Sequence, residues 1–192
     1  MKRHHVLFLI AGLLAVLLGA ALFLARPDDA ERGLPPGGDF VLHGADGPLD
    51  TKTLRGKLLL VYFGYTTCPD ICPATLSTGA QALRLLTPAE RSQVRMLMIS
   101  VDPERDSLPH LRQYASFFHP EMLGVSGSPE ELAAVARQFG ASYRRSPVQA
   151  DGSYAIDHTT TTYVIDAGGK LVSTIPFGST PDQVAAAVRR FL

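Results

Sequence analysis

The sequence has few cysteines and no excess charge of either sign. Its 192 residues include two cysteines, 18 basic and 18 acidic side chains, so the formal net charge is zero. Two cysteines do not describe a disulfide-rich scaffold. A balanced charge gives no support to nucleic-acid binding, which usually shows as a basic stripe. The chain also lacks G-x-x-x-x-G-K-[ST] and G-x-G-x-x-G motifs and internal repeats, so no phosphate-binding loop is predicted.

The amino terminus carries a long uncharged run. Val6 to Ala25 contains no charged residue, and twenty helical residues span roughly 30 Å, the thickness of bilayer hydrocarbon. Lys2 and Arg3 precede the run, so the positive-inside bias predicts residues 1–5 in the cytoplasm and the rest across the membrane. A cleaved signal peptide is the alternative, but the apolar run continues beyond the small residues Gly19-Ala20-Ala21. We expect a retained single-pass transmembrane anchor, residues 6–25, in a bacterial inner membrane.

The remaining chain predicts a linker and one α/β domain. Residues 26–38 are rich in proline and glycine, and residues 39–192 are long enough to bury a single core. The patterns indicate strands at 40–43, 58–63, 94–101, 161–165 and 171–175, and helices at 73–86, 108–118, 129–139 and from 181 onward. Such alternation indicates an α/β fold. A strand that delivers cysteines to the start of a helix is the arrangement of a thioredoxin-like fold, although periodicity alone does not establish that topology.

Both cysteines lie in one short segment, Cys68-Pro69-Asp70-Ile71-Cys72, directly after the strand at 58–63. A disulfide closing so short a loop removes little chain entropy, so a purely stabilising role is weak. Pro73 disfavours helical geometry at the residue before it, so we expect Cys72 at the helix cap and Cys68 in the preceding loop. Free amides and the helix dipole favour thiolates there. The pair therefore predicts either a redox-active disulfide or a soft-metal site.

Two sulfurs leave a metal ion under-coordinated, and His158 is the candidate for a third ligand. It precedes the strand at 161–165, and in a thioredoxin-like fold the loop leading into that strand faces the cysteines. His4 and His5 are expected to lie on the other side of the membrane. The remaining histidines are expected to be solvated or packed rather than ligands: His43, His110 and His119.

Three segments together resemble the SCO/SenC family: Tyr62 to Pro73, Ser100 to Asp106, and Asp157-His158 before a strand. Members are membrane-anchored, thioredoxin-like copper proteins that serve assembly of the dinuclear copper centre of cytochrome c oxidase. The resemblance covers essentially the whole predicted soluble domain. Thr159 is a departure, because many members have serine after the histidine, but a hydroxyl group is kept.

The resemblance implies that Cys68, Cys72 and His158 are copper ligands. Two thiolates suit Cu(I), and an imidazole also accommodates Cu(II); zinc accepts the same atoms but normally takes a fourth ligand. The implied partner is the copper-accepting subunit of cytochrome c oxidase, with another copper chaperone or a thiol reductase as a further partner. Asp157 either orients the imidazole or serves as a turn or cap residue.

Other residues near these motifs have structural interpretations. Tyr62, Phe63 and Tyr65 are interpreted as core and rim packing rather than copper contacts. Asp70 is not interpreted as a ligand. Asp102 and Arg105 are interpreted chiefly as a structural turn, with an exposed edge facing a partner as the alternative.

The leading hypothesis is a periplasmic copper metallochaperone that carries one copper ion per chain and passes it on by ligand exchange. The alternative is an enzyme, a thiol–disulfide reductase that keeps the target's metal-binding cysteines reduced. Both can hold for one protein, because the same thiols serve either task. A thiol peroxidase is a weaker third hypothesis, since no peroxidatic thiol is distinct from the metal-binding pair.

Overall fold

The apolar run after the first hairpin becomes the central strand of a five-stranded sheet. The computed structural model describes residues 33–192, and all seven residues of β3 (Leu58–Gly64) are buried. A strand with no exposed face is expected where both faces of a sheet are covered. β3 pairs in parallel with β4 (Val94–Ser100) and antiparallel with β8 (Thr162–Ile165).

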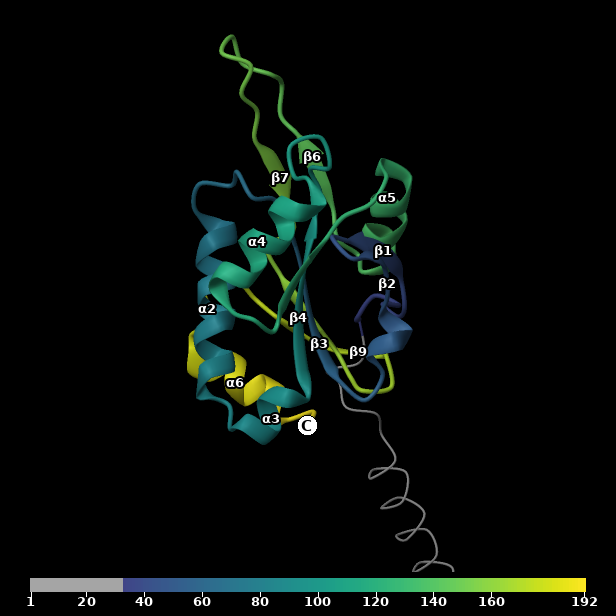
Figure 1. Ribbon diagram of the computed structural model, residues 1–192, viewed down its shortest axis with the longest axis vertical. Coiled ribbons are helices and arrows are strands. Elements are labelled where there is room, and N and C mark those ends of the chain that lie inside the picture. The colour runs from purple at the N-terminus through teal and green to yellow at the C-terminus, as the bar shows by residue number, and fades with distance from the viewer. Residues whose placement is uncertain (1–32) are drawn as a thin grey trace, which may run out of the picture. The chain divides into compact units, whose positions relative to one another are not determined.

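The sheet has the order β5-β4-β3-β8-β9 (Figure 1). β5 (Met122–Val125) is parallel to β4, and β9 (Leu171–Ile175) is antiparallel to β8. The predicted hairpin between 161–165 and 171–175 is confirmed by β8 and β9. β5 was not predicted from the sequence.

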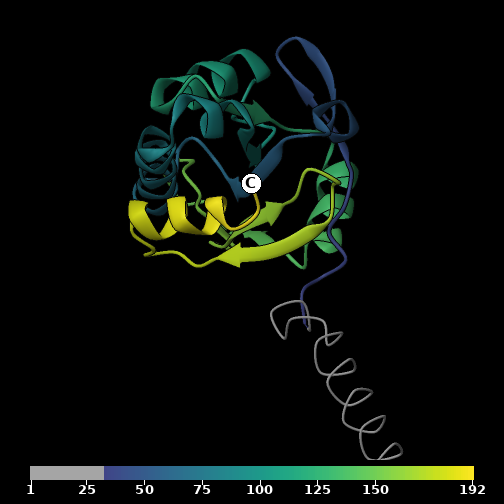
Figure 2. The same ribbon diagram turned by 90° about the horizontal axis from the view of Figure 1, so that it is seen from below.

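Helices cover both faces of the sheet, as the sequence predicted for an α/β domain. They are α2 (Ile71–Leu85), α3 (Pro88–Ser92), α4 (Leu108–Phe118), α5 (Pro129–Gln138) and α6 (Pro181–Arg189), with a 3-10 turn, η2 (Thr51–Leu54). α2, α4 and α6 lie on one side and α5 on the other (Figures 1 and 2). Ser128 and Thr180 each form the predicted capping box at the start of a helix.

Aromatic side chains fill the space between the sheet and α5. The ring of Phe139 packs edge to face against Phe40, Phe63 and Tyr163, with centroids 5.8, 6.0 and 5.4 Å away. These distances are typical of favourable aromatic pairs. The cluster fixes the position of β3 from the side opposite to α2.

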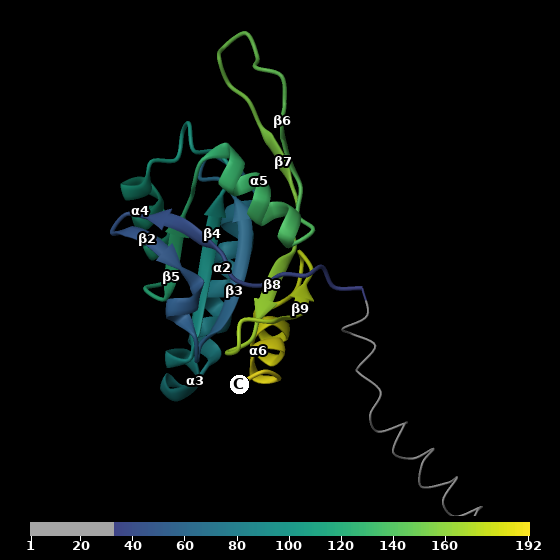
Figure 3. The ribbon, with the colours of Figure 1, turned by 90° about the vertical axis from the view of Figure 1, so that its right-hand side faces the viewer.

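Two short hairpins lie outside the five-stranded sheet. β1 (Val41–Gly44) pairs with β2 (Gly47–Asp50), close to the predicted strand at 40–43. β6 (Tyr143–Arg145) pairs with β7 (Ile156–His158), a hairpin that the sequence did not predict. Figure 3 shows β6 and β7 rising beyond the sheet at the end from which α2 starts. This end of the molecule therefore brings together the segments that carry the cysteines and His158.

The predicted cytoplasmic stub (1–5), the anchor (6–25) and most of the linker (26–38) lie outside the described residues, as do His4 and His5. These assignments stay predictions. Among residues 33–192, none of the helices has the length and apolar character that crossing a bilayer requires.

Candidate metal centre

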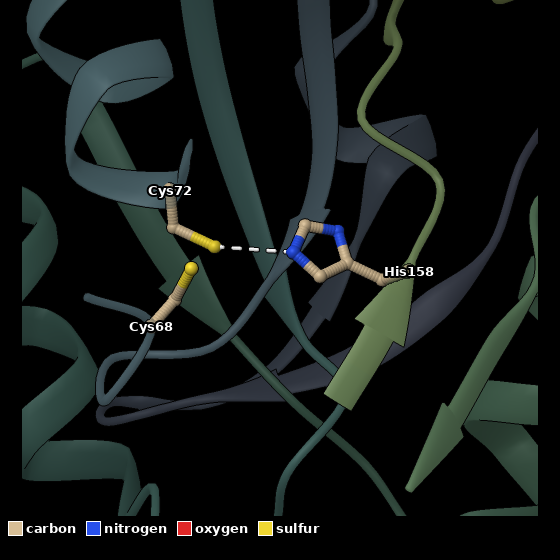
Figure 4. Close-up of side chains that lie close together, drawn as sticks. All are labelled: Cys68, Cys72 and His158. Carbon is tan, nitrogen blue, oxygen red and sulfur yellow. Dashed lines mark hydrogen bonds between the residues drawn. The ribbon is translucent and has the colours of Figure 1, made fainter. Parts of the chain in front are cut away.

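The two cysteines lie where the loop after β3 leads into α2 (Figure 4). Cys68 is half-buried in the loop, and Cys72 is fully buried in the first turn of α2. The prediction that Cys72 is the cap residue is wrong, because α2 begins at Ile71 and Asp70 is its N-cap. Pro73 falls inside the first turn, where an amide hydrogen has no helical partner to lose, so the helix can start before it.

His158 comes from a distant segment to face the thiols. It is the last residue of β7 rather than part of the loop predicted before the strand at 161–165. Its Nε2 lies 3.3 Å from Sγ of Cys72 (Figure 4). One donor atom each from Cys68, Cys72 and His158 lie within 4.8 Å of one another. The structure therefore brings together the three residues that the sequence singled out.

The imidazole of His158 presents a lone pair to the thiols. Nδ1 lies 3.1 Å from the carbonyl oxygen of Thr159, and a carbonyl can only accept, so Nδ1 carries the hydrogen. Burial lowers the pKa of His158 below its ordinary value, so the ring is neutral at neutral pH. Nε2 is then unprotonated and can accept the S–H of Cys72 or bind a metal ion.

The structure shows no hydrogen bond between the carboxylate of Asp157 and the imidazole of His158, so an orienting role for Asp157 stays a prediction. Its side chain is 74% exposed and lies 3.4 Å from Nη2 of Arg144. Successive side chains of a strand point to opposite faces, which turns Asp157 away from the site when His158 faces it. The backbone carbonyl of Thr159 orients the ring.

The two thiols have different acidities. Burial raises the pKa of Cys72 to about 12. Burial also acts to raise the pKa of Cys68, but hydrogen bonds from the backbone amides of Cys72, Asp70 and Ile71 outweigh it and leave that pKa below its ordinary value. These amides are free because they belong to the start of a helix. Cys68 is therefore the more accessible and the more readily ionised thiol.

Two tyrosines hold the imidazole between them. The rings of Tyr62 and Tyr65 pack edge to face against His158, with centroids 5.9 and 5.8 Å away. The Tyr65 hydroxyl accepts a hydrogen bond from the amide of Ile156 on β7, at 3.3 Å. Interpreting these tyrosines as core packing was right about their burial but missed their contacts with the site. Both tyrosines lie close to the end of the strand that leads to Cys68, and this position in the sequence could have indicated that they contact the site.

The turn after β4 ties the β6–β7 hairpin to the sheet. Asp102 pairs with Arg105 and accepts a hydrogen bond from the Tyr154 hydroxyl at 2.7 Å. The Arg105 guanidinium lies 3.6 Å from the ring centroid of Tyr154 and donates to its carbonyl at 3.0 Å. The structural interpretation of Asp102 and Arg105 is confirmed by these bonds.

The remaining described histidines have other contacts. His43 lies 3.4 Å from Glu131, the ring of His110 lies beside Tyr114, and Nδ1 of His119 accepts from the amide of Glu121. Across residues 33–192, Cys68, Cys72 and His158 form the one group of three or more His, Cys, Asp or Glu side chains arranged to hold a metal ion.

The donor set suits a soft metal ion. Atoms about 2.0–2.3 Å from one ion lie within about 4.6 Å of each other, close to the spacing observed among the three donors. Two sulfurs and one imidazole nitrogen favour copper or zinc over magnesium or calcium, which prefer oxygen. The fold and the site thus define a thioredoxin-like protein with a three-donor centre for a soft metal at the start of a helix.

The chain belongs to the SCO1/SenC family, whose sequence profile matches residues 28–192. The mitochondrial protein SCO2 homolog of Bos taurus is 37% identical over 158 residues, which cover 81% of this chain and 59% of the bovine protein. The chain thus spans about three fifths of the length of that relative.

Solved structures show the same fold. The solution structure of apo Sco1 from Thermus thermophilus is 39% identical, with a TM-score of 0.75, and the match covers 82% of this chain and 92% of that one. ScoI from Bradyrhizobium japonicum, solved with copper bound, is 38% identical, with a TM-score of 0.74, and the match covers 82% of this chain and 99% of that one. The predicted thioredoxin-like fold is confirmed by this similarity.

Proposed function

We propose that this protein is a metallochaperone that binds copper through Cys68, Cys72 and His158 and delivers it to cytochrome c oxidase. The observation that carries the proposal is the convergence of two sulfurs and one imidazole nitrogen within 4.8 Å. Membership of the SCO1/SenC family and the copper-bound relative from Bradyrhizobium japonicum support copper as the metal. Copper is the cargo in this proposal, and the acceptor is the oxidase subunit that holds the dinuclear copper centre.

The site can take up and release an ion by exchanging one ligand at a time. Cys68 offers a thiolate first, because its pKa is below the ordinary value. Cys72 then loses its proton to solvent on binding, and Nε2 of His158, 3.3 Å from its sulfur, keeps its lone pair for the ion. Three donors leave Cu(I) open to attack by a cysteine of the acceptor, so no step requires a bare ion in water.

The proposed location follows from the amino-terminal sequence. The predicted span at 6–25 would anchor the chain in the bacterial inner membrane and place the copper-binding domain in the periplasm. In that arrangement the domain and a membrane-bound oxidase share one surface, and diffusion between them is confined to two dimensions.

Anaerobic titration with Cu(I) against a competing chelator tests the proposal. The wild-type chain is expected to bind one equivalent, and Cys68→Ala, Cys72→Ala and His158→Ala are each expected to weaken binding strongly. His110→Ala is the matched control, because this exposed ring lies beside Tyr114 on α4. If His158→Ala leaves the affinity for both Cu(I) and Cu(II) unchanged, the three-ligand centre is wrong.

The difference between the two thiols supports a second function, thiol–disulfide reduction of the acceptor's cysteines. A half-buried thiol with a lowered pKa beside a buried thiol with a raised pKa is suited to attack followed by resolution. Cys68 would attack the target disulfide and form a mixed disulfide, releasing one target thiol. Cys72 would then attack the sulfur of Cys68, forming the Cys68–Cys72 disulfide and releasing the target with both cysteines reduced. Cys72→Ser is expected to trap that mixed disulfide on Cys68, and His158→Ala is expected to spare the reaction. Failure to trap any partner with either single-cysteine variant would count against this function.

A further inference from the structure

The hydroxyl group of Tyr62 points at a sulfur of the centre from inside the core. Tyr62 lies near the end of β3 and has 0% of its surface exposed. Its hydroxyl donates to Sγ of Cys72 at 3.6 Å. A buried hydroxyl without a partner is destabilising, and the sulfur is the acceptor that the structure provides.

A glycine leaves the space for this contact. Gly64 lies two residues beyond Tyr62 and therefore on the same face of β3. A Cβ atom at position 64 would lie 2.8 Å from Cε1 of Tyr62 and 3.0 Å from Sγ of Cys72. Any side chain there would push the ring or the sulfur aside. Tyr62 and Gly64, on the same face of β3, therefore allow the phenol to contact the thiol of Cys72.

The hydrogen bond has a different effect on the two copper oxidation states. A donor to a thiolate withdraws electron density from the sulfur and weakens its donation to a bound ion. Cu(II) depends more on that donation than Cu(I), so hydrogen bonding around a cysteine ligand tunes the reduction potential of copper sites. The phenol of Tyr62 is an O–H donor, and its oxygen lies 3.6 Å from Sγ of Cys72 in a site closed to solvent.

We infer that Tyr62 is a positioning residue that biases the centre toward Cu(I) over Cu(II). The inference rests on the proposed function, because it assigns a preferred oxidation state to the copper that the site carries. The hydroxyl acts through Cys72, and the ring, edge to face against His158, holds the imidazole in register with the sulfurs.

The test compares Tyr62→Phe with Tyr163→Phe in the full chain. Phenylalanine keeps the buried ring at position 62, so the core packing is preserved. Tyr163 is a matched control, since it is also a buried tyrosine of the same sheet, on the neighbouring strand β8, and it packs against Phe63 and Phe139. Affinities for Cu(I) and Cu(II) are measured by competition with chelators, together with the wavelength of the sulfur-to-Cu(II) charge-transfer band.

Tyr62→Phe is expected to shift the ratio of the two affinities about tenfold toward Cu(II), equivalent to about 1.4 kcal/mol. The charge-transfer band is expected to move to longer wavelength, and Tyr163→Phe is expected to change neither quantity. Equal weakening of both affinities, or an unchanged ratio and band, overturns the inference while leaving the copper function intact. A wild-type chain that binds neither oxidation state overturns the proposed function and this inference with it.

Discussion

The carboxylate of Asp106 binds Thr66 twice, through the backbone amide at 2.9 Å and through the hydroxyl at 2.5 Å. Thr66 is two residues before Cys68, in the loop between β3 and α2. The same carboxylate accepts a hydrogen bond from Ser100 at the end of β4, at 2.6 Å. One buried side chain therefore fixes the cysteine loop to the sheet.

Replacing this carboxylate is expected to affect both stability and metal binding. Asp106→Asn exchanges one acceptor oxygen for a donor group, so a hydroxyl that donates to it must reverse its direction or lose the hydrogen bond, and the remaining bonds no longer involve a charged acceptor. The expected loss in free energy of unfolding is about 1–3 kcal/mol. The affinity for Cu(I) is expected to fall several-fold, because the loop that carries Cys68 is less constrained. Urea denaturation and chelator competition measure the two effects.

Asp151→Asn is the control, because this carboxylate lies on an exposed loop and accepts a hydrogen bond from the amide of Ser153. A loss of stability in Asp106→Asn with wild-type Cu(I) affinity would show that Asp106 supports the fold but not the geometry of the centre.

Neutralising Asp157 is expected to leave copper binding nearly unchanged. Its carboxylate forms an exposed pair with Arg144 and makes no hydrogen bond to His158, and exposed ion pairs contribute little. We expect Asp157→Asn to change the Cu(I) affinity by less than about twofold. Chelator competition on the two proteins measures this, and a tenfold loss would return the carboxylate to an orienting role.

A methyl group at position 64 is expected to displace Cys72 or Tyr62 and so to disturb the metal centre. In Gly64→Ala the new Cβ meets Cys72 and Tyr62, so the sulfur or the ring must move. The expected cost is about 1–3 kcal/mol of stability, together with weaker Cu(I) binding by the folded protein. Thermal denaturation and anaerobic titration measure the two changes.

Gly79→Ala is the matched control within α2. Its Cβ would meet the flexible end of Met96, with Sδ at 2.6 Å, away from the thiols. This variant is expected to keep wild-type copper affinity, and a similar loss of affinity in both variants would contradict a local effect at Cys72.

The pair between Glu90 and Arg189 predicts a specific acid dependence of stability. The hydrogen bond from Arg189, together with the amide of Thr87, lowers the pKa of Glu90 from 4.5 to about 2. A lowered folded-state pKa means that the contribution of Glu90 is fully present above pH 4.5 and is lost as the pH falls toward 2. Glu90→Gln is therefore expected to be less stable than wild type at pH 7 and to approach it near pH 2.

Urea denaturation across this pH range measures the difference. Glu130→Gln, an exposed first-turn glutamate of α5, is the control. A stability difference for Glu90→Gln that is constant between pH 7 and 2 would exclude the charge of Glu90 as its source.

Elements with strong local patterns were predictable from the sequence. The all-apolar run of β3, the hairpin of β8 and β9, and the capping boxes of Ser128 and Thr180 each carry their signal within a few residues. The cysteine pair and His158 were singled out by residue type and by their position relative to the predicted strands.

Features that depend on tertiary contacts were not predictable in the same way. The strand Tyr143–Arg145 is polar and short, so no pattern marks the hairpin that carries His158. The start of α2 before Pro73 and the role of the Thr159 carbonyl both depend on backbone geometry, which composition does not report. The hydroxyl of Tyr62 faces Cys72 only because β3 and α2 pack together. The sequence pattern therefore marks Tyr62 as a core residue and gives no sign of its contact with the thiol.

The nitrogen donor and the sulfur donors lie on segments that belong to, or follow, different sheets. Within residues 33–192, β7 pairs only with β6, whereas the cysteines follow a strand with neighbours on both sides in the five-stranded sheet. The contacts of this ribbon with Asp102, Arg105 and Tyr65 involve side chains, so it can open without breaking the hydrogen-bond ladders of the larger sheet. We expect opening of that ribbon to move the imidazole while both sulfurs keep their places, so that a bound ion loses its nitrogen ligand before its sulfur ligands.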